Sequence, residues 1–292
     1  MRVLITGSGG LLGGNVVSTA IERGWEVVGT YHSAAPEFDC PLYQLDVRSR
    51  SDCKAVFENV RPDAVINCAA VTDVDGCETN PEQANAVNVE GARTLAQLAH
   101  DWDIQFLHTS TDYVFDGNRE SPYPEEAPTN PLQTYGESKL AGEKAVRDVY
   151  RSAVIARLSF VYGRTQPAGE LSGFPAWVRE TAATGESVPL FTDQYITPSQ
   201  AETTAQTLLE LLNIGAQGTY NVACRSYVTP YEFGETLLEE LGRSADLLEP
   251  SSLEAINREA SRPAYTCLDT AKVESLLGRP QPTLTEDITA LF

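Results

Sequence analysis

The sequence predicts an α/β fold, a doubly wound parallel sheet followed by a smaller C-terminal α/β lobe. Through the first half of the chain, short apolar runs alternate with amphipathic segments, which is the pattern of parallel strands covered by helices. Beyond about residue 160 the strands shorten and proline-bearing turns interrupt them. We therefore expect a sheet domain over 1–160 and a smaller lobe over 161–292, and we leave open that the chain crosses back to the sheet.

Apolar runs bounded by turn residues locate the expected elements. The strands of the sheet are predicted at Arg2–Thr6, Glu26–Tyr31, Leu42–Leu45, Ala64–Ala69, Gln105–Thr109 and Val154–Leu158. The clearest helix is Pro81–His100, with Asn80 as a candidate N-cap. Gly163–Gly173 reads as a loop. The smaller lobe is expected to hold strands Val188–Phe191 and Thr219–Val222 and helices Ala201–Leu212 and Pro230–Leu241.

Charge and composition exclude several classes of protein. The chain carries 41 acidic and 21 basic residues, a net charge of −20, which repels nucleic acid and anionic membranes. Nearly all the positive charge is arginine, and this balance suggests a halophilic protein whose self-repulsion is screened by salt. The chain has neither the shape of a signal peptide nor an apolar run that could span a membrane, so we expect a cytoplasmic protein. Six scattered cysteines without a paired motif indicate reduced thiols and no metal site.

A glycine-rich turn joins the first strand to the first helix. Gly7, Gly10 and Gly13 allow a tight turn and let backbone N–H groups approach a pyrophosphate at the helix N-terminus. This context, a strand before the turn and a helix after it, predicts a Rossmann domain that binds a dinucleotide.

The end of the second strand bears on the choice of cofactor. An NAD site usually has a carboxylate there for the adenosine ribose, whereas this chain has Thr30-Tyr31-His32-Ser33. No arginine follows directly, and we interpret His32 as a residue at the solvent edge. The pattern slightly favours NADP(H) and keeps NAD(H) open.

A second motif points to reductive chemistry. Tyr135 and Lys139 are four residues apart, so on a helix they share one face and point into one cleft. An ammonium group beside a phenol stabilises the phenolate and makes tyrosine a better acid–base group at neutral pH. A hydroxyl after the fifth strand, in Thr109–Thr111, can hydrogen-bond a substrate carbonyl. These residues together predict a carbonyl reductase.

The sequence resembles the extended short-chain dehydrogenases, and among them the dTDP-4-dehydrorhamnose reductases. The strings STDYVFDG and YGESKLAGE are the most specific part of the resemblance, which spans nearly the whole chain. It rests on Asn67–Ala70, Ser110–Gly117, Tyr135–Glu143, Arg157–Gly163, Asp193-Gln194, Thr197-Pro198, Arg262-Pro263 and Leu268-Asp269.

The resemblance implies roles for individual residues. The catalytic residues would be Thr111, Tyr135 and Lys139, the last two also contacting the cofactor. The rest of the cofactor site would be formed by Gly7, Gly10, Leu11, Leu12, Gly13, Asp46, Val47, Ala69 and Ala70. The substrate would contact Thr111, Asp112, Phe160, Phe174 and Arg262. Phe160 stands where the family usually has tryptophan, which puts the identity of the sugar in doubt.

The expected reaction is therefore NAD(P)H-dependent reduction of the 4-keto group of a nucleotide-linked deoxysugar, with dTDP-4-dehydro-L-rhamnose giving dTDP-L-rhamnose. Two alternatives stay open. One is a sugar-nucleotide epimerase or dehydratase on the same scaffold, although Thr111 lacks the Asp-Glu pair that dehydratases commonly carry. The other is a non-catalytic NADP-binding regulatory subunit resembling the methionine adenosyltransferase β subunit. A homodimer is the expected assembly.

Overall fold

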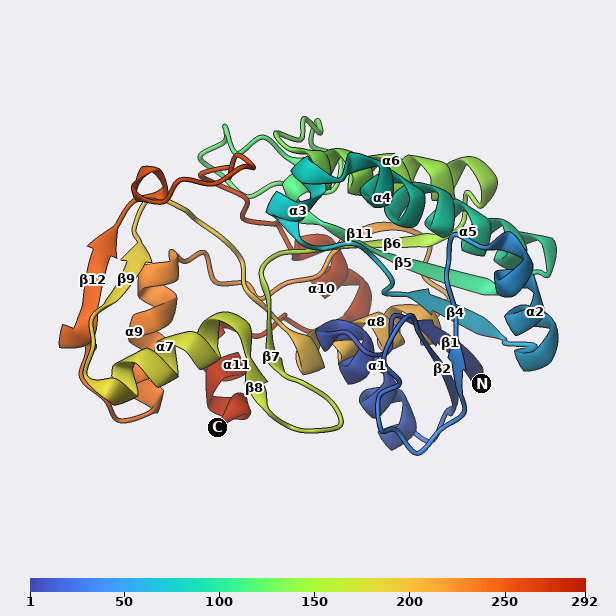
Figure 1. Cartoon of the computed structure of the whole chain (residues 1–292), viewed down its shortest axis with the longest axis horizontal. Helices are drawn as coiled ribbons and strands as arrows, with labels where there is room; N and C mark the ends of the chain where they lie inside the picture. The colour runs from blue at the N-terminus through green and yellow to red at the C-terminus, as the bar shows by residue number, and fades with distance from the viewer.

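A computed structural model describes residues 1–292 and places seven parallel strands in one central sheet (Figure 1). Their spatial order is β11-β6-β5-β4-β1-β2-β3, so the chain moves outward in one direction, returns to β1 and continues in the other. The strands are β1 Arg2–Thr6, β2 Glu26–Tyr31, β3 Leu42–Gln44, β4 Ala64–Asn67, β5 Gln105–Thr111, β6 Val154–Leu158 and β11 Gly218–Asn221. This order is that of the Rossmann fold, and the predicted fold class is confirmed.

Several strand ends differ from the prediction by one or two residues, and contacts explain two of these differences. Strand β4 stops at Asn67 because the Asn67 side chain, through Oδ1, accepts the N–H of Ala69 at 3.2 Å. Strand β5 runs on to Thr111 because β6 pairs with it up to the Thr111–Leu158 register. The Thr111 hydroxyl, a predicted catalytic group, thus lies at the carboxyl end of β5.

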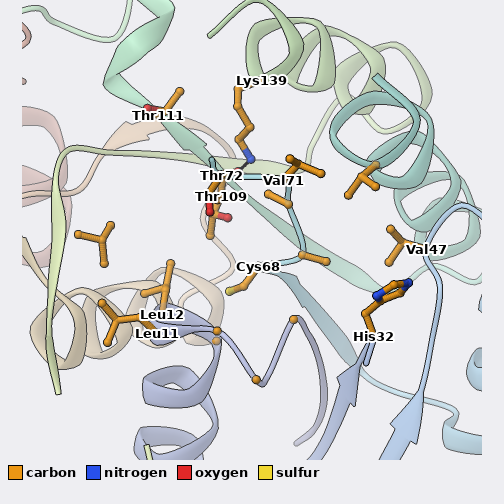
Figure 2. Close-up of a pocket in the computed structure, with 18 of the residues that line it drawn as sticks. Leu11, Leu12, His32, Val47, Cys68, Val71, Thr72, Thr109, Thr111 and Lys139 are labelled. Atoms are coloured by element: carbon orange, nitrogen blue, oxygen red, sulfur yellow. Dashed lines mark hydrogen bonds between the residues drawn. The ribbon is translucent and has the colours of Figure 1, made fainter. Parts of the chain in front are cut away.

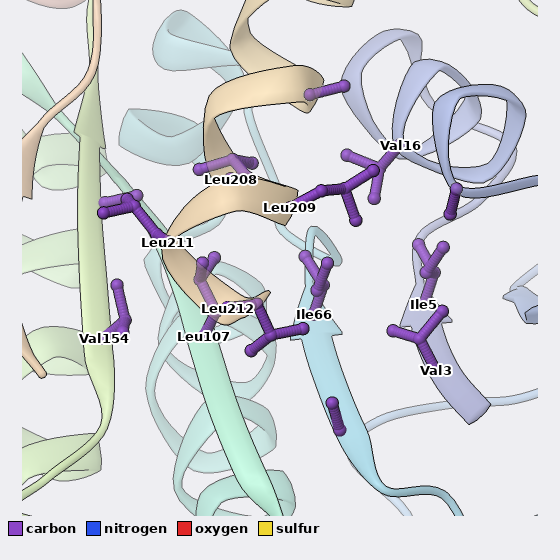
Figure 3. Packing of buried hydrophobic residues seen from close by; sticks show 14 of the residues in the cluster. Val3, Ile5, Val16, Ile66, Leu107, Val154, Leu208, Leu209, Leu211 and Leu212 are labelled. Atoms are coloured by element: carbon purple, nitrogen blue, oxygen red, sulfur yellow. The ribbon is translucent and has the colours of Figure 1, made fainter. Parts of the chain in front are cut away.

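Helices cover both faces of the sheet (Figure 1). One face carries α1 Leu11–Glu22, α8 Ala201–Asn213 and α10 Ala271–Leu277. The other carries α2 Arg50–Val60, α3 Val74–Thr79, α4 Pro81–Asn85, α5 Ala92–Asp101 and α6 Thr134–Val149. Figure 3 shows the first of the two cores, where Leu208 and Leu212 of α8 and Val16 of α1 pack on Ile5 and Ile66 of the strands. Each face buries its own apolar cluster, which fixes the sheet between two helical layers.

The predicted helix over Pro81–His100 is continuous but not uniform. Between α4 and α5 the backbone takes a π-helical segment, η1 Ala86–Gly91. Inside it the Asn88 amide pairs with both backbone polar groups of Val71 and donates to Ser138 Oγ at 2.9 Å. Such bulges concentrate at functional sites, and this one holds the loop after β4 against α6.

The smaller lobe has its own core and two small sheets. Its elements are β7 Val161–Arg164, β8 Leu171–Ser172, α7 Gly173–Thr184, β9 Val188–Phe191, β10 Ser199–Gln200, α9 Pro230–Glu240, η3 Ala245–Leu247, β12 Leu248–Ser251, η4 Leu253–Ala255 and α11 Leu284–Leu291. The order is β10-β7-β8 in one sheet and β12-β9 in the other. The stretch expected to be a loop, Gly163–Gly173, begins and ends in paired strands, since Gly163 and Ser172 are partners in an antiparallel β7–β8 pair. The loop proper is shorter than predicted.

Two elements expected in the smaller lobe lie with the large sheet. Strand β11 pairs in parallel with β6, and α8 packs on α1 beneath the sheet. The chain therefore crosses back to the sheet after residue 160. None of the helices has the length and apolar run that a membrane-spanning helix requires.

Candidate active site

A cavity of about 840 Å³ lies at the carboxyl ends of the central strands. Its wall combines the turn after β1 with the ends of β2, β4 and β5 and with one face of α6. Predicted site residues on this wall are Gly7, Gly10, Leu11, Leu12, Gly13, Asp46, Val47, Ala69, Ala70, Thr111, Asp112, Tyr135, Lys139 and Phe160. Figure 2 shows Lys139 and Thr111 on one side of it and Leu11 and Leu12 on another. Ligands of doubly wound sheets bind at this edge.

The turn after β1 has the geometry of a pyrophosphate cradle. Gly7 has φ +71°, and a Cβ there would stand 2.9 Å from the Ala69 nitrogen. A Cβ on Gly13 would collide with the Gly7 carbonyl oxygen. Helix α1 follows with Gly10 as its N-cap, and no side chain caps its first turn. Its free N–H groups and helix dipole are therefore available to an anion, and the residues fit a dinucleotide.

Lys139 is held inside the protein by its neighbours. The side chain is buried, and its ammonium donates to the Thr109 carbonyl oxygen at 2.7 Å. Burial lowers the pKa of Lys139 to about 8, while the carboxylate of Glu143, one turn further along α6, opposes that shift. The lysine is thus largely cationic at neutral pH and faces the cavity.

Tyr135 lies one turn before Lys139 on the same face of α6 and packs edge-on against Tyr113, ring centroids 6.1 Å apart. Burial raises the pKa of Tyr135, and its interaction with the Thr111 hydroxyl acts in the opposite direction. The phenol is therefore protonated at neutral pH. A protonated group is what a proton donor requires.

Thr111 and Asp112 form a buried hydrogen-bonded unit at the end of β5. The Thr111 hydroxyl donates to Asp112 Oδ1 at 3.0 Å and accepts the N–H of Tyr113 at 3.2 Å. Ser159 donates to the second Asp112 oxygen at 2.8 Å. Burial raises the pKa of Asp112 to about 6, against these hydrogen bonds. To donate to a substrate oxygen, Thr111 must turn its proton away from Asp112.

Comparison with known proteins identifies the family to which this chain belongs. The family model described as RmlD substrate binding domain matches residues 1–292. A dTDP-4-dehydrorhamnose reductase from Mycolicibacterium smegmatis is 31% identical over 93% of this chain and 79% of its own length. The chain belongs to the dTDP-4-dehydrorhamnose reductase family. It is an NAD(P)-dependent oxidoreductase that acts on the 4-keto group of sugar nucleotides, as that family does.

The reductase is also similar to a second curated protein and to a solved structure. A protein of Haloferax volcanii, called a probable low-salt glycan biosynthesis reductase, is 51% identical over 100% of this chain and 97% of its own length. The crystal structure of the Bacillus anthracis dTDP-4-dehydrorhamnose reductase in complex with NADP is 26% identical, with a TM-score of 0.88 over 100% of this chain and 98% of that one.

Phe160 of the reductase is held in a strained backbone conformation beside the cavity. Its φ is +42°, in the left-handed region that a bulky side chain rarely occupies. Its carbonyl oxygen accepts the N–H of Ser199, and its ring packs edge-on against Phe174, centroids 5.3 Å apart. Phe174 itself does not line the cavity. Phe174 therefore packs against Phe160 without lining the cavity, whereas the sequence predicts that both residues contact the substrate.

Arg262, the other predicted substrate residue, also lies outside the cavity wall. Its guanidinium binds Asp75 of α3 at 2.7 Å, and Asp75 also accepts the N–H of Ala260. These contacts fasten the C-terminal part of the chain to the sheet domain beside Val74, which does line the cavity.

Sequence reasoning missed several residues of the reductase's cavity wall. Arg48 stands there together with His32, although no arginine follows β2 directly in sequence. The wall also contains Val71, Thr72 and Ile196. The signal that could have revealed Arg48 is its position just after β3, because β2 and β3 are adjacent and parallel and end at the same edge.

Proposed function

We propose that the protein reduces the 4-keto group of dTDP-4-dehydro-L-rhamnose to give dTDP-L-rhamnose, with NADP(H) slightly favoured over NAD(H). The observation that carries this proposal is that Thr111, Tyr135 and Lys139 line the same cavity as the glycine turn. We assign these three residues the catalytic roles. Asp112 and Phe160 are proposed to contact the sugar, with Phe174 and Arg262 supporting the substrate lobe.

When bound, NAD(P)H supplies a hydride to the carbonyl carbon. Tyr135 then gives its phenolic proton to the developing oxyanion, and its raised pKa keeps that proton available at neutral pH. Lys139 stabilises the resulting phenolate by its charge and holds the nicotinamide ribose. Thr111 orients the carbonyl by a hydrogen bond, which it can donate once its hydroxyl leaves Asp112.

The proposed sugar is one member of a class of substrates. Phenylalanine at position 160 retains an apolar face for a sugar ring but lacks the indole N–H of the usual tryptophan. A related 4-keto sugar for glycan synthesis is the second candidate, favoured by the high identity to the Haloferax volcanii reductase.

The test is a panel of 4-keto nucleotide sugars assayed with NADPH and with NADH at low and high salt. Tyr135→Phe should lower turnover by about two or more orders of magnitude with cofactor affinity nearly unchanged, because the proton donor alone is lost. Tyr231→Phe, at a half-buried tyrosine of the smaller lobe, is the matched control.

Near-wild-type turnover by Tyr135→Phe would remove this tyrosine from its assigned role. Cofactor binding by the wild type without reduction of any sugar in the panel would favour the regulatory-subunit alternative.

A further inference from the structure

The ends of β2 and β3 form one side of the cavity, away from the catalytic residues. The two ends are tied together, since Leu45 donates its N–H to the Tyr31 carbonyl at 2.8 Å and the Gln44 amide donates to the His32 carbonyl at 3.0 Å. Figure 2 shows His32 and Val47 close together here and Thr111 on the far side. A dinucleotide whose pyrophosphate lies on the glycine turn and whose nicotinamide faces Tyr135 directs its adenosine to this side.

An arginine with unused donors stands at this end. The guanidinium of Arg48 binds the Asp46 carboxylate through Nε, at 2.9 and 3.0 Å, and through Nη2, at 2.6 Å. These bonds leave Nη1 for another acceptor. His32 Nε2 lies 4.0 Å from the same carboxylate, and Ser33 adds a hydroxyl to the wall.

The ion pair at this end is partly exposed to solvent. The side chain of Arg48 is 45% exposed and that of Asp46 33%, so solvent screens their attraction. A phosphate group carries more negative charge than a carboxylate, and two of its oxygens can accept hydrogen bonds from the planar guanidinium of an arginine. In a chain of net charge −20, the cavity wall contains one arginine, Arg48, and one lysine, Lys139, and Lys139 lies at the opposite end, beside Thr109.

We propose that Arg48, with His32 and Ser33, forms a subsite for the phosphate on the 2′ position of the adenosine of NADP(H), and that Asp46 limits how strongly Arg48 binds it. This inference rests on the proposed use of NADP(H). The Asp46–Arg48 pair remains closed with NAD(H) and opens toward the phosphate with NADP(H). Both cofactors are therefore accepted, and the pair sets the ratio of their affinities.

The two members of the ion pair can be tested against each other by calorimetric titration of NADP and NAD, without substrate. Arg48→Ala should weaken NADP binding about tenfold and leave NAD binding within about twofold, because only the phosphate loses a partner. Asp46→Asn should shift the NADP-to-NAD affinity ratio the other way, since it frees Arg48 and removes a negative charge. Damage to the fold would weaken both cofactors together.

Arg50→Ala is the matched control, since Arg50 is an exposed arginine of α2 outside the cavity wall and its loss changes the net charge equally. Its NADP-to-NAD ratio should equal that of the wild type. Titration of adenosine 2′,5′-bisphosphate and adenosine 5′-monophosphate isolates the phosphate, and the difference between them should vanish in Arg48→Ala.

The failures are distinguishable. If wild-type protein binds NADP no more tightly than NAD, the proposed cofactor preference is wrong. If it prefers NADP and Arg48→Ala retains the preference, the subsite is elsewhere and the inference is overturned. A change of ratio in the same direction in Arg48→Ala and Asp46→Asn would also overturn it.

Discussion

The buried ion pair between Glu143 and Arg157, one helical turn after Lys139, allows a direct test of what stabilises this part of the protein. Arg157 binds Glu143 through two hydrogen bonds, at 2.9 and 2.7 Å, and Ser110 donates to the same carboxylate at 2.6 Å. Glu143 is 3% exposed and Arg157 5%. The prediction is that Glu143→Gln, which retains the shape and loses the charge, leaves the Arg157 guanidinium buried without a counter-charge.

Removing one partner of a buried ion pair destabilises a protein by about 3–5 kcal/mol, because the remaining charge is desolvated without compensation. We expect a loss of this size in the free energy of unfolding of Glu143→Gln, measured by urea titration. The exposed pair Lys54–Glu58, at 62% and 54% exposure, is the control. Glu58→Gln should change stability by no more than about 0.5 kcal/mol.

A second variant separates loss of the pair from loss of packing. Adding Arg157→Met to Glu143→Gln removes the uncompensated charge, so the double variant should be more stable than the single one. The reasoning is refuted if Glu143→Gln costs less than about 1 kcal/mol, or if the two substitutions simply add. Glu143→Gln should also lower the pKa of Lys139, because the carboxylate no longer opposes burial, and move the alkaline limit of activity to lower pH.

Three further predictions address the cofactor turn, pH and salt. Gly10→Val should leave the fold intact, because a Cβ there meets only the Gly7 oxygen at 3.4 Å, yet weaken cofactor binding in a fluorescence titration; unchanged affinity would make the turn merely structural. Burial raises the pKa of Asp287 from 3.8 to about 7, so the unfolded state loses this proton first and stability falls progressively as pH rises from about 4 to about 7. Asp287→Asn should therefore raise the melting temperature more at pH 8 than at pH 5, and an equal shift would contradict this. With net charge −20, the melting temperature should climb with chloride from about 0.01 M, where the Debye length is about 30 Å, into the molar range, and a flat curve above about 0.2 M would exclude the halophilic interpretation.

Local patterns in the sequence were enough to predict the sheet and the centre of the site. Gly7 lies in the turn after β1 and Gly13 in the first turn of α1, and Tyr135 and Lys139 lie one helical turn apart, so the spacing within each pair is set by local backbone structure. The strands could be located because short apolar runs bounded by turn residues are typical of the buried parallel strands of an α/β fold.

Tertiary contacts decided what the local pattern leaves open. Strand β11 has the same local signal as a strand of the smaller lobe, and only its pairing with β6 brings it to the large sheet. Arg48 lines the cavity because β3 lies beside β2. Arg262 lies outside the cavity because its guanidinium binds Asp75, 187 positions earlier in the sequence. Residues far apart in sequence meet only after the sheet has formed, so their partners depend on the energies of the whole packed chain, whereas a turn or a helix face is set by the few residues within it.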